Sequence, residues 1–451
     1  MGMIKKIKVK NTFKLNCTGK PSTELINCKR SKNIAVLPSS INHIKPKLLL
    51  KLGDKVTTGM PLFIDKRDPQ IQFCSPGSGT ISKINYGPRR SLDEVIITLD
   101  EKETFVDFST YTSEDITSLD RKDIVNYLAN AGVWPVLKSF PFKAIPSLDD
   151  IPPSIYVSLD NDEAFTPQTE VLLDYYSNEL KLGLTILKKL TDKCFVSCSA
   201  SNKKVQKLFS THITHHITGD YPANDPGVFL YYNKKDKSEN NSWGIKIEDV
   251  IRIGMLCKSG KYPTERIISL GGPLVKKPIH VKTREGAEIS SIIDGQNCGL
   301  NSRIIAGGLL TGRNAGKNSF LGYYEFAINV IKEGQDLEIL SFMKMGLDKP
   351  TVSNAYISSL IKNKSFEMHS GLFGGHRACI ACNACPSVCP VGIYPQLLMK
   401  SVKAGDLEES LQHGLLDCVE CGLCTYVCPS KIELSDIFEK EKKRLSKEVL
   451  G

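Results

Sequence analysis

The 451-residue sequence predicts a multidomain protein of the mixed α/β class, and three observations carry this prediction. The length is typical of about three domains. A hydrophobic content of 41% is enough for packed cores and argues against a disordered chain. The residue pattern also changes along the chain, from short strands, to strands alternating with helices, to strands with glycines, and finally to a cysteine-rich helical segment.

The first predicted domain, residues 1–100, contains an N-terminal segment and a small β module. Turn residues such as Gly53-Asp54 and Gly77-Ser78-Gly79 separate its strands. The expected strands are Ile34–Leu37, Pro61–Asp65, Gln70–Cys74 and Thr80–Ile84. The segment resembles the barrel-sandwich hybrid of biotinyl and lipoyl carriers, but a carrier needs a lysine beside Met at the hairpin tip. This chain has Lys66-Arg67-Asp68-Pro69 there, so we interpret the module as structural.

The second predicted domain, residues 101–255, alternates strands with helices, which favours a Rossmann-like fold with a largely parallel sheet. We expect strands at Ser154–Leu159 and Cys194–Ser199, and helices at Asp123–Ala131, at Pro167–Leu180 and from Lys203. Such folds bind nucleotides at glycine-rich turns. The candidate turn, Ala131–Pro135, contains one glycine, which argues against a phosphate-binding loop.

The third predicted domain, residues 256–345, returns to strands and glycines between Ile267 and Ile331. Strand, strand, helix and strand around Gly271-Gly272-Pro273 are typical of a β-grasp (SLBB-like) module. The segment TGRNAGKN lies near the P-loop pattern. However, Thr311 stands at the first glycine position and Asn318 replaces the required Ser or Thr, so we reject ATP binding.

The last predicted domain, residues 346–451, contains eight of the fifteen cysteines, in two copies of the run C-x2-C-x2-C-x3-C-P. This spacing is typical of paired [4Fe-4S] clusters, in which three thiolates hold one cluster and the fourth cysteine ligates the other. The sequence therefore predicts no catalytic residues and two metal-ligand sets. One is Cys379, Cys382, Cys385 and Cys428, and the other is Cys418, Cys421, Cys424 and Cys389.

Structural zinc and disulfides are the two alternative uses of these cysteines. Tetrahedral zinc accepts four thiolates, but zinc sites rarely use a duplicated run of eight cysteines. Disulfides suit secreted chains, and the basic start MGMIKKIKVK lacks the apolar core of a secretory signal. The linker between the two runs has helical spacing broken at Gly405, and the tail IFEKEKKRLSKEVL is an amphipathic helix. This pattern predicts an α-helical ferredoxin domain.

The remaining histidines and cysteines favour ordinary packing roles. His212, His215 and His216 lie in a segment rich in β-branched residues, which argues against the helix that would align them around a metal. The other cysteines are expected to be buried small hydrophobes. They are Cys17, Cys28, Cys74, Cys194, Cys198, Cys257 and Cys298.

The charge and hydropathy patterns restrict the partners and the location. The net charge of +10 is spread along the chain, without the interleaved aromatic residues of a nucleic-acid site. No run of about 18 apolar residues occurs, so no spanning helix is expected. We therefore expect a chain in a reducing cytosol that binds a membrane surface only peripherally.

Seven stretches in order resemble the NqrA family of the sodium-translocating NADH:quinone reductase, which is related to the RnfC family of the Rnf complex. Both families are related to the NADH- and FMN-binding subunit of complex I. The stretches are GKPS, the GD-x-V-x2-G-x-PLF-x-DK segment, Gly219–Ala223, EDVIRIG, SLGGPLVKKP, FLGYYEFAINVI and CTYVCPSKIEL. The segment GVWPVLKSFPF is similar to the NqrA family, which lacks the glycine-rich FMN loop. The eight cysteines are similar to the RnfC family, whereas the familiar NqrA proteins keep only a remnant of the second run.

The resemblance implies a peripheral subunit on the cytoplasmic face of the inner membrane. It would belong to an ion-translocating NADH:quinone oxidoreductase and carry electrons through two [4Fe-4S] clusters. FMN is not expected, and quinone binding is left open because no residue marks a site. The alternatives are an RnfC-like protein that oxidises NADH through FMN, and an adaptor whose clusters only hold its structure.

Overall fold

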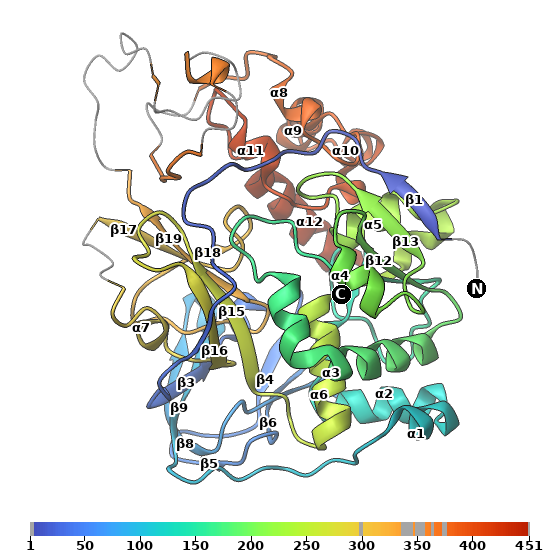
Figure 1. Ribbon diagram of the computed structural model, residues 1–451, viewed down its shortest axis with the longest axis vertical. Coiled ribbons are helices and arrows are strands. Elements are labelled where there is room, and N and C mark those ends of the chain that lie inside the picture. Colours follow the sequence, from blue (N-terminus) through green and yellow to red (C-terminus); the bar gives the residue numbers. More distant parts are fainter. Residues whose placement is uncertain are drawn as a thin grey trace.

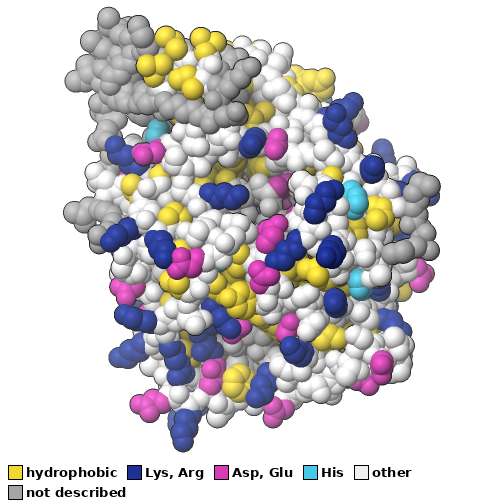
Figure 2. Space-filling model, in the orientation of Figure 1, with side chains coloured by type: hydrophobic (Ala, Val, Ile, Leu, Met, Phe, Trp, Pro, Cys, Tyr) yellow, Lys and Arg dark blue, Asp and Glu magenta, His cyan; other side chains and the backbone are white. Residues whose placement is uncertain are grey.

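The computed structural model describes residues 4–296, 301–334, 346–347, 357–361, 365–371 and 377–449. Figure 1 shows an α/β unit beside a unit built on a mixed β-sheet. The N-terminal β module lies below them and the C-terminal helices lie above. On the face in Figure 2, Lys and Arg side chains are scattered among Asp and Glu rather than gathered in one stripe. The charge distribution on this face therefore agrees with the even spread in the sequence.

The N-terminal β module consists of two small antiparallel sheets. Their inner faces meet in a core where Phe63 and Phe73 stack with ring centroids 4.6 Å apart. The four expected strands are present, β6 with the predicted ends and the other three with end shifts of at most two residues. One sheet has the order β3 (Asn33–Val36), β9 (Leu92–Leu99), β8 (Gly79–Tyr86) and β5 (Lys55–Val56), and the other β4 (Pro46–Leu48), β6 (Pro61–Asp65) and β7 (Gln72–Cys74).

The second unit is built on a six-stranded sheet that is parallel except at β10. The strand order is β1 (Lys5–Lys8), β13 (His215–Thr218), β12 (Cys194–Ser199), β11 (Ile155–Ser158), β14 (Trp243–Lys246) and β10 (Lys138–Ser139). The helices are α1 (Ser113–Ser118), α2 (Arg121–Asn130), α3 (Thr169–Leu190), α4 (Lys203–Leu208), α5 (Pro226–Asn233) and α6 (Ile247–Ser259). The parallel sheet is the one that the strand and helix alternation predicts.

Helix α3 continues ten residues past Leu180, where the sequence prediction ended it. The glycine that follows, Gly183, does not stop the helix, because it lies at the close crossing with α6 (Figure 1). A Cβ there would lie 2.2 Å from the Val250 carbonyl oxygen, and one at Gly254 would lie 1.7 Å from that of Glu179. Both glycines are therefore required by helix packing.

In its described residues, the third unit is a mixed six-stranded sheet with one short helix, α7 (Ile289–Ile292). Its strand order is β18 (Arg313–Ala315), β17 (Ser302–Ala306), β19 (Ala327–Lys332), β15 (Glu265–Gly271), β16 (Ile279–Arg284) and β2 (Leu25–Asn27). Most of the segment TGRNAGKN forms β18 and the turn after it, not a phosphate loop.

The first 30 residues do not belong to the β module that follows them in the sequence. Strand β1 pairs in parallel with β13 in the second unit, and β2 pairs in parallel with β16 in the third. Only from β3 onward does the chain enter the β module. The N-terminal segment therefore links two later units.

The C-terminal unit is helical, as expected. It contains α8 (Ala384–Ser387), α9 (Pro395–Ala404), α10 (Leu407–Gln412), α11 (Leu423–Tyr426) and α12 (Leu434–Val449). Gly405 adopts a left-handed conformation, φ 73°, and ends α9 at the predicted break. Apolar side chains of this unit, among them Leu398 and Phe438, share one core with Tyr156 and Phe229 of the second unit.

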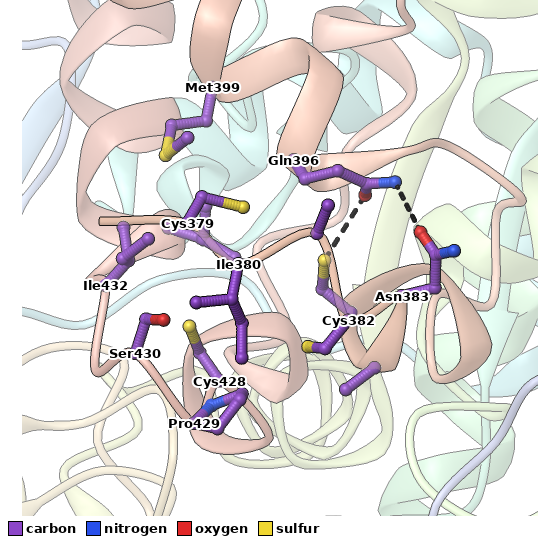
Figure 3. Close-up of a pocket in the computed structure, with 14 residues that line it drawn as sticks. Cys379, Ile380, Cys382, Asn383, Gln396, Met399, Cys428, Pro429, Ser430 and Ile432 are labelled. Carbon is purple, nitrogen blue, oxygen red and sulfur yellow. Dashed lines mark hydrogen bonds between the residues drawn. The ribbon is translucent and has the colours of Figure 1, made fainter. Parts of the chain in front are cut away.

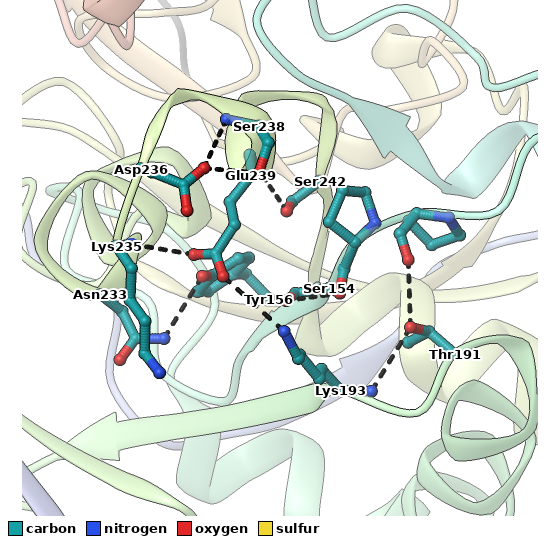
Figure 4. Close-up of polar contacts among 12 residues, drawn as sticks. Ser154, Tyr156, Thr191, Lys193, Asn233, Lys235, Asp236, Ser238, Glu239 and Ser242 are labelled. Carbon is teal, nitrogen blue, oxygen red and sulfur yellow. Dashed lines mark hydrogen bonds and ion pairs between the residues drawn. The ribbon is translucent and has the colours of Figure 1, made fainter.

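The loop between α5 and β14 is ordered by the buried side chain of Glu239 (Figure 4). Its carboxylate accepts a hydrogen bond from the Lys235 backbone N–H at 3.0 Å and lies 3.8 Å from the Lys193 ammonium. Asp236 caps the short 3-10 turn Lys237–Asn241 by accepting from the Ser238 N–H at 2.8 Å. The loop therefore holds α5, which faces the C-terminal unit, beside the sheet.

The histidines have packing roles in the structure. His215 and His216 lie in strand β13, and the buried His215 ring packs edge-on against Phe195 and Phe229. Its Nε2 atom lies 3.1 Å from the Asn233 side-chain oxygen. Burial and the nearby Lys5 lower the pKa of His215 to about 4, so this ring is neutral at physiological pH.

The expectation that the seven other cysteines are all buried is only partly correct. Cys74, Cys198 and Cys257 are buried, because they point into sheet and helix cores. Cys17, Cys28 and Cys194 keep partial exposure, since they lie in loops or near a strand end. Cys298 lies outside the described residues.

A buried ionic network joins the second and third units. The Glu285 carboxylate accepts from Arg252 at 2.9 Å, from Tyr262 at 3.0 Å and from Arg266. The Arg252 guanidinium also lies 4.2 Å from the centre of the Tyr323 ring. The side chains of Glu285 and Arg252 are 3% and 1% exposed, so removal of Glu285 takes a carboxylate away from two guanidinium groups that are shielded from water.

We predict that Glu285→Gln destabilises the fold by about 3 to 5 kcal/mol, because the buried Arg266 loses its carboxylate contact and Arg252 keeps only its 3.2 Å pair with Asp249. Urea unfolding followed by circular dichroism measures the effect. The matched control is Glu24→Gln, which removes the exposed 2.8 Å pair with Lys277 and should cost less than about 1 kcal/mol. Equal effects of the two substitutions would contradict the prediction.

Candidate metal centre

The eight C-terminal cysteines line two separate pockets. The first is lined by Cys379, Cys382, Cys385 and Cys428, and the second by Cys389, Cys418, Cys421 and Cys424. In Figure 3 the labelled cysteines of the first pocket surround a common space beside Ile380. Each pocket thus combines three cysteines of one run with the last cysteine of the other.

The two cysteine loops have the same backbone conformation at corresponding positions. The residue before the second cysteine is left-handed in both, with φ 53° at Ala381 and 59° at Glu420. The residue after it is left-handed as well, with φ 58° at Asn383 and 78° at Gly422. Because side chains other than glycine rarely adopt this conformation, its repetition indicates that the duplicated sequence encodes one turn twice.

A polar side chain from the following helix contacts the third cysteine of each run. Cys385 Sγ lies 3.3 Å from Gln396 Oε1 near the start of α9, and Gln396 also donates to the Asn383 side chain at 3.1 Å (Figure 3). Cys424 Sγ lies 3.7 Å from Ser435 Oγ at the start of α12. Sequence analysis missed both residues, although they stand at the same offset after the third cysteine of each run.

The two pockets differ in exposure. Cys379 and Cys382 of the first pocket are exposed, and Ile380 between them is 68% exposed. Cys389 of the second pocket is buried, and Cys418, Cys421 and Cys424 are only partly exposed. The first pocket therefore lies at the surface and the second lies deeper.

Burial also changes the chemistry of the thiols. It raises the pKa of Cys389 to about 11, against the opposing effect of the Val391 and Ile393 backbone N–H groups. It likewise raises the pKa of Cys385 to about 11 and that of Cys424 to about 12. These thiols stay protonated at neutral pH without a bound cation, whereas a metal that replaces the protons makes them thiolate ligands.

Among the residues that the structure describes, no three His, Cys, Asp or Glu side chains could hold one metal ion together. Zinc would require four ligands about 2.1 to 2.3 Å from a single centre. Each set of four cysteines borders one pocket, which matches the four thiolate ligands of a [4Fe-4S] cluster.

The loop of the second pocket is attached to the rest of the molecule by direct hydrogen bonds. The Tyr221 hydroxyl donates to the Cys421 carbonyl at 2.7 Å. Lys143 donates to the Val419 carbonyl at 2.6 Å, and Lys442 donates to that of Cys418 at 3.0 Å. Three side chains distant in sequence thus hold three peptide units of this loop.

Glu420 completes this attachment. Its carboxylate lies 3.4 Å from the Lys143 ammonium and 2.6 Å from that of Lys442. Burial alone would raise the pKa of Glu420, but the two lysines outweigh it and lower the pKa to about 2. Glu420 is therefore ionised throughout the physiological pH range.

A cavity of about 790 Å³ adjoins the second pocket at the carboxyl ends of β11 and β14. Most of its charged lining residues are acidic: Asp160, Asp162, Glu163, Asp225, Glu248, Asp249, Glu420, Glu433, Asp436 and Glu439, against Lys138, Lys143, Lys246 and Arg303. Glu163 accepts from the Leu310 and Thr311 backbone N–H groups at 3.0 and 3.2 Å. Thus the third unit closes one side of the cavity.

The turn Ala131–Pro135 is not open to this cavity as a phosphate loop. Ala131, Val133 and Trp134 are buried. A Cβ on Gly132, φ 66°, would lie 2.5 Å from Cys74 Sγ. The β module therefore fills the position where a glycine-rich loop would need space for a ligand.

Family comparisons cover all four units. Residues 7–100 match the NqrA N-terminal barrel-sandwich hybrid domain, 119–262 the NqrA second alpha/beta domain and 267–317 the NQRA C-terminal (SLBB) domain. Residues 378–432 match a 4Fe-4S dicluster domain. The NqrA protein of the Na+-translocating NADH-quinone reductase from Marinomonas sp. (strain MWYL1) is 30% identical over 91% of this chain and 92% of its own length. The chain belongs to the NqrA family.

Other members of the NqrA family are equally similar. The NqrA proteins from Saccharophagus degradans and Hahella chejuensis are 31% and 32% identical, each over 91% of this chain and 92% of the relative. The crystal structure of an NAD+-reducing [NiFe]-hydrogenase in the air-oxidized state matches loosely, with a TM-score of 0.33 and 10% identity over 51% of this chain and 52% of that one. In the described part of this family member, no helix has the length and apolar character needed to cross a membrane.

The acidic cavity generates a pH prediction. Burial raises the pKa of Asp162 to about 7, although the Asn224 backbone N–H, 2.7 Å away, opposes the shift. Between about pH 4 and 7 the folded state therefore binds a proton that the unfolded state has released, and stability falls as the pH rises. Asp162→Asn removes this penalty. Relative to the wild type, the substitution should raise the free energy of unfolding at pH 8 by at least about 1 kcal/mol more than it does at pH 4.

Urea unfolding at the two pH values measures this difference. Asp294→Asn, at an exposed ion pair with Lys29, is the control and should change stability equally at both. A pH dependence of Asp162→Asn identical to that of the wild type would refute the assignment.

Proposed function

We propose that this chain is a peripheral electron-transfer subunit of a membrane-bound, ion-translocating NADH:quinone oxidoreductase of the Na+-translocating type. The family membership and the names of the relatives support the complex, and the two four-cysteine pockets support the electron-carrying role. Its partners would be the other subunits of the complex, at the cytoplasmic face of the inner membrane. The observation that carries the proposal is the grouping of all eight cysteines into two sets of four.

The proposed cofactors are two [4Fe-4S] clusters, one in each pocket. Bound clusters would supply single-electron transfer, and no acid–base residue is needed. The protein positions the thiols through the repeated left-handed turns, limits water access by burial and supplies hydrogen bonds at the sulfurs. The exposed loop at Ile380 gives an electron partner access to the first pocket.

At the level of domains, we propose the boundaries 1–100, 101–255, 256–345 and 346–451, with helix α6 (Ile247–Ser259) running four residues past the second boundary. The second unit would correspond to the FMN-binding domain of the complex I relative without its phosphate loop. The last unit would be an α-helical ferredoxin domain like that of the RnfC family. The helices between the two cysteine runs and the buried turn at Gly132 support these assignments.

The RnfC-like alternative, direct NADH oxidation through FMN, is disfavoured by charge. FMN and NADH carry phosphates, and the cavity at the sheet edge is lined by ten carboxylates against four basic side chains. Quinone has no such charge conflict, but no described contact marks a quinone site.

Anaerobic reconstitution tests the two-cluster proposal. Iron and sulfide analysis should give about eight Fe per chain. Fewer than about six Fe per chain would contradict the two-cluster proposal. Cys428→Ala should remove the same EPR signal as Cys379→Ala, although the two cysteines belong to different runs. Cys389→Ala and Cys418→Ala should remove the other signal.

Each of these substitutions should leave about four Fe per chain. Cys194→Ser, outside both pockets, is the control and should keep both signals. If Cys428→Ala and Cys424→Ala instead remove the same EPR signal, each run holds its own cluster. That outcome would contradict the proposed grouping of the cysteines.

A further inference from the structure

The charges around the two cysteine pockets are unequal. The side chains that line the first pocket are cysteines and uncharged residues such as Ile380, Gln396 and Met399. The loop of the second pocket carries Glu420, which contacts Lys143 and Lys442. Two cations and one anion are therefore in direct contact at the edge of the second pocket, beside the acidic cavity.

These charges lie in partly or fully buried positions. The Lys442 side chain is 3% exposed, that of Glu420 21% and that of Lys143 30%. Coulomb interactions strengthen as the surrounding dielectric constant falls, so the three charges act more strongly on the pocket than solvated groups would. Both ammonium groups are also fixed by hydrogen bonds to the peptide units at Cys418 and Val419.

A cluster that accepts an electron gains one negative charge. Burial disfavours this charge, whereas a fixed cation nearby stabilises it. Net charge, hydrogen bonding and solvent exposure are the factors by which a protein sets the potential of an iron–sulfur cluster. The deeper pocket thus carries a burial penalty together with a pair of cations that offset it.

We propose that Lys143 and Lys442 are positioning residues that raise the reduction potential of the cluster held by Cys389, Cys418, Cys421 and Cys424, and that Glu420 moderates their effect. This inference rests on the proposed function, because it requires that cluster. Lys143 follows β10 in the second unit, and Lys442 belongs to α12. The α/β unit, which lacks a phosphate loop, would thus act on the redox centre through one lysine.

The test is an EPR-monitored redox titration of the reconstituted full chain with dithionite as reductant. Lys143→Met and Lys442→Met should each lower the equilibrium constant for one-electron reduction of the second cluster at least tenfold, a shift of about 59 mV. Glu420→Gln should shift it in the opposite direction. The first cluster should keep its potential in all three variants, and Lys143→Arg should restore the wild-type value.

The matched control is Lys440→Met, on the same helix but 74% exposed and paired with Asp436. It should leave both potentials unchanged. Shifts of the same sign in Lys143→Met and Glu420→Gln, or unchanged potentials with full iron content, would overturn the inference. Loss of the second cluster from all three variants would also overturn it, because these residues would then have a structural role. Absence of either signal from the wild type would instead refute the proposed function.

Discussion

The attachment of the Cys418–Cys421 loop to the rest of the chain is the contact on which the arrangement of the C-terminal unit depends. A short loop with a left-handed residue at its third position has little to hold it by itself. Two lysines and Tyr221 reach its peptide carbonyls, and Glu420 pairs with both lysines. One of the two cysteine pockets is therefore defined jointly by the α/β unit and by the last helix, rather than by the iron–sulfur motif alone.

The same dependence on distant contacts runs through the other units. Strands β1 and β2 place the N-terminal segment in two later sheets. The buried Glu285 joins α6 to the sheet of the third unit through Arg252. The Glu163 carboxylate accepts hydrogen bonds from the 310–311 loop of the third unit and so holds that loop against the α/β unit. Leu310 in turn lies against Gly422 of the second cysteine run. The second pocket thus lies where the α/β unit, the third unit and the C-terminal unit meet, whereas the first pocket lies at the surface.

The α/β unit has a largely parallel sheet, and the turn that the sequence offered as a phosphate loop is closed. Its single-glycine turn is filled by Cys74 of the β module, and the cavity at its carboxyl edge is predominantly acidic. Two side chains of this unit, Lys143 and Tyr221, donate hydrogen bonds to the backbone of the Cys418–Cys421 loop and support it. Under the proposed function, the α/β unit supports the second cysteine pocket and the C-terminal unit carries the electrons.

By itself the sequence determined the local structures: the repeated cysteine turns, the strands of the β module, the alternation that forms the parallel sheet and the helix break at Gly405. These depend on backbone preferences and periodicities that act within a few residues. Tertiary structure alone decided that α3 continues past Gly183, that β1 and β2 join distant sheets, and that Lys143 and Lys442 reach the second cysteine loop. The physical reason is that these contacts join residues far apart along the chain, so their partners exist only after the units have packed.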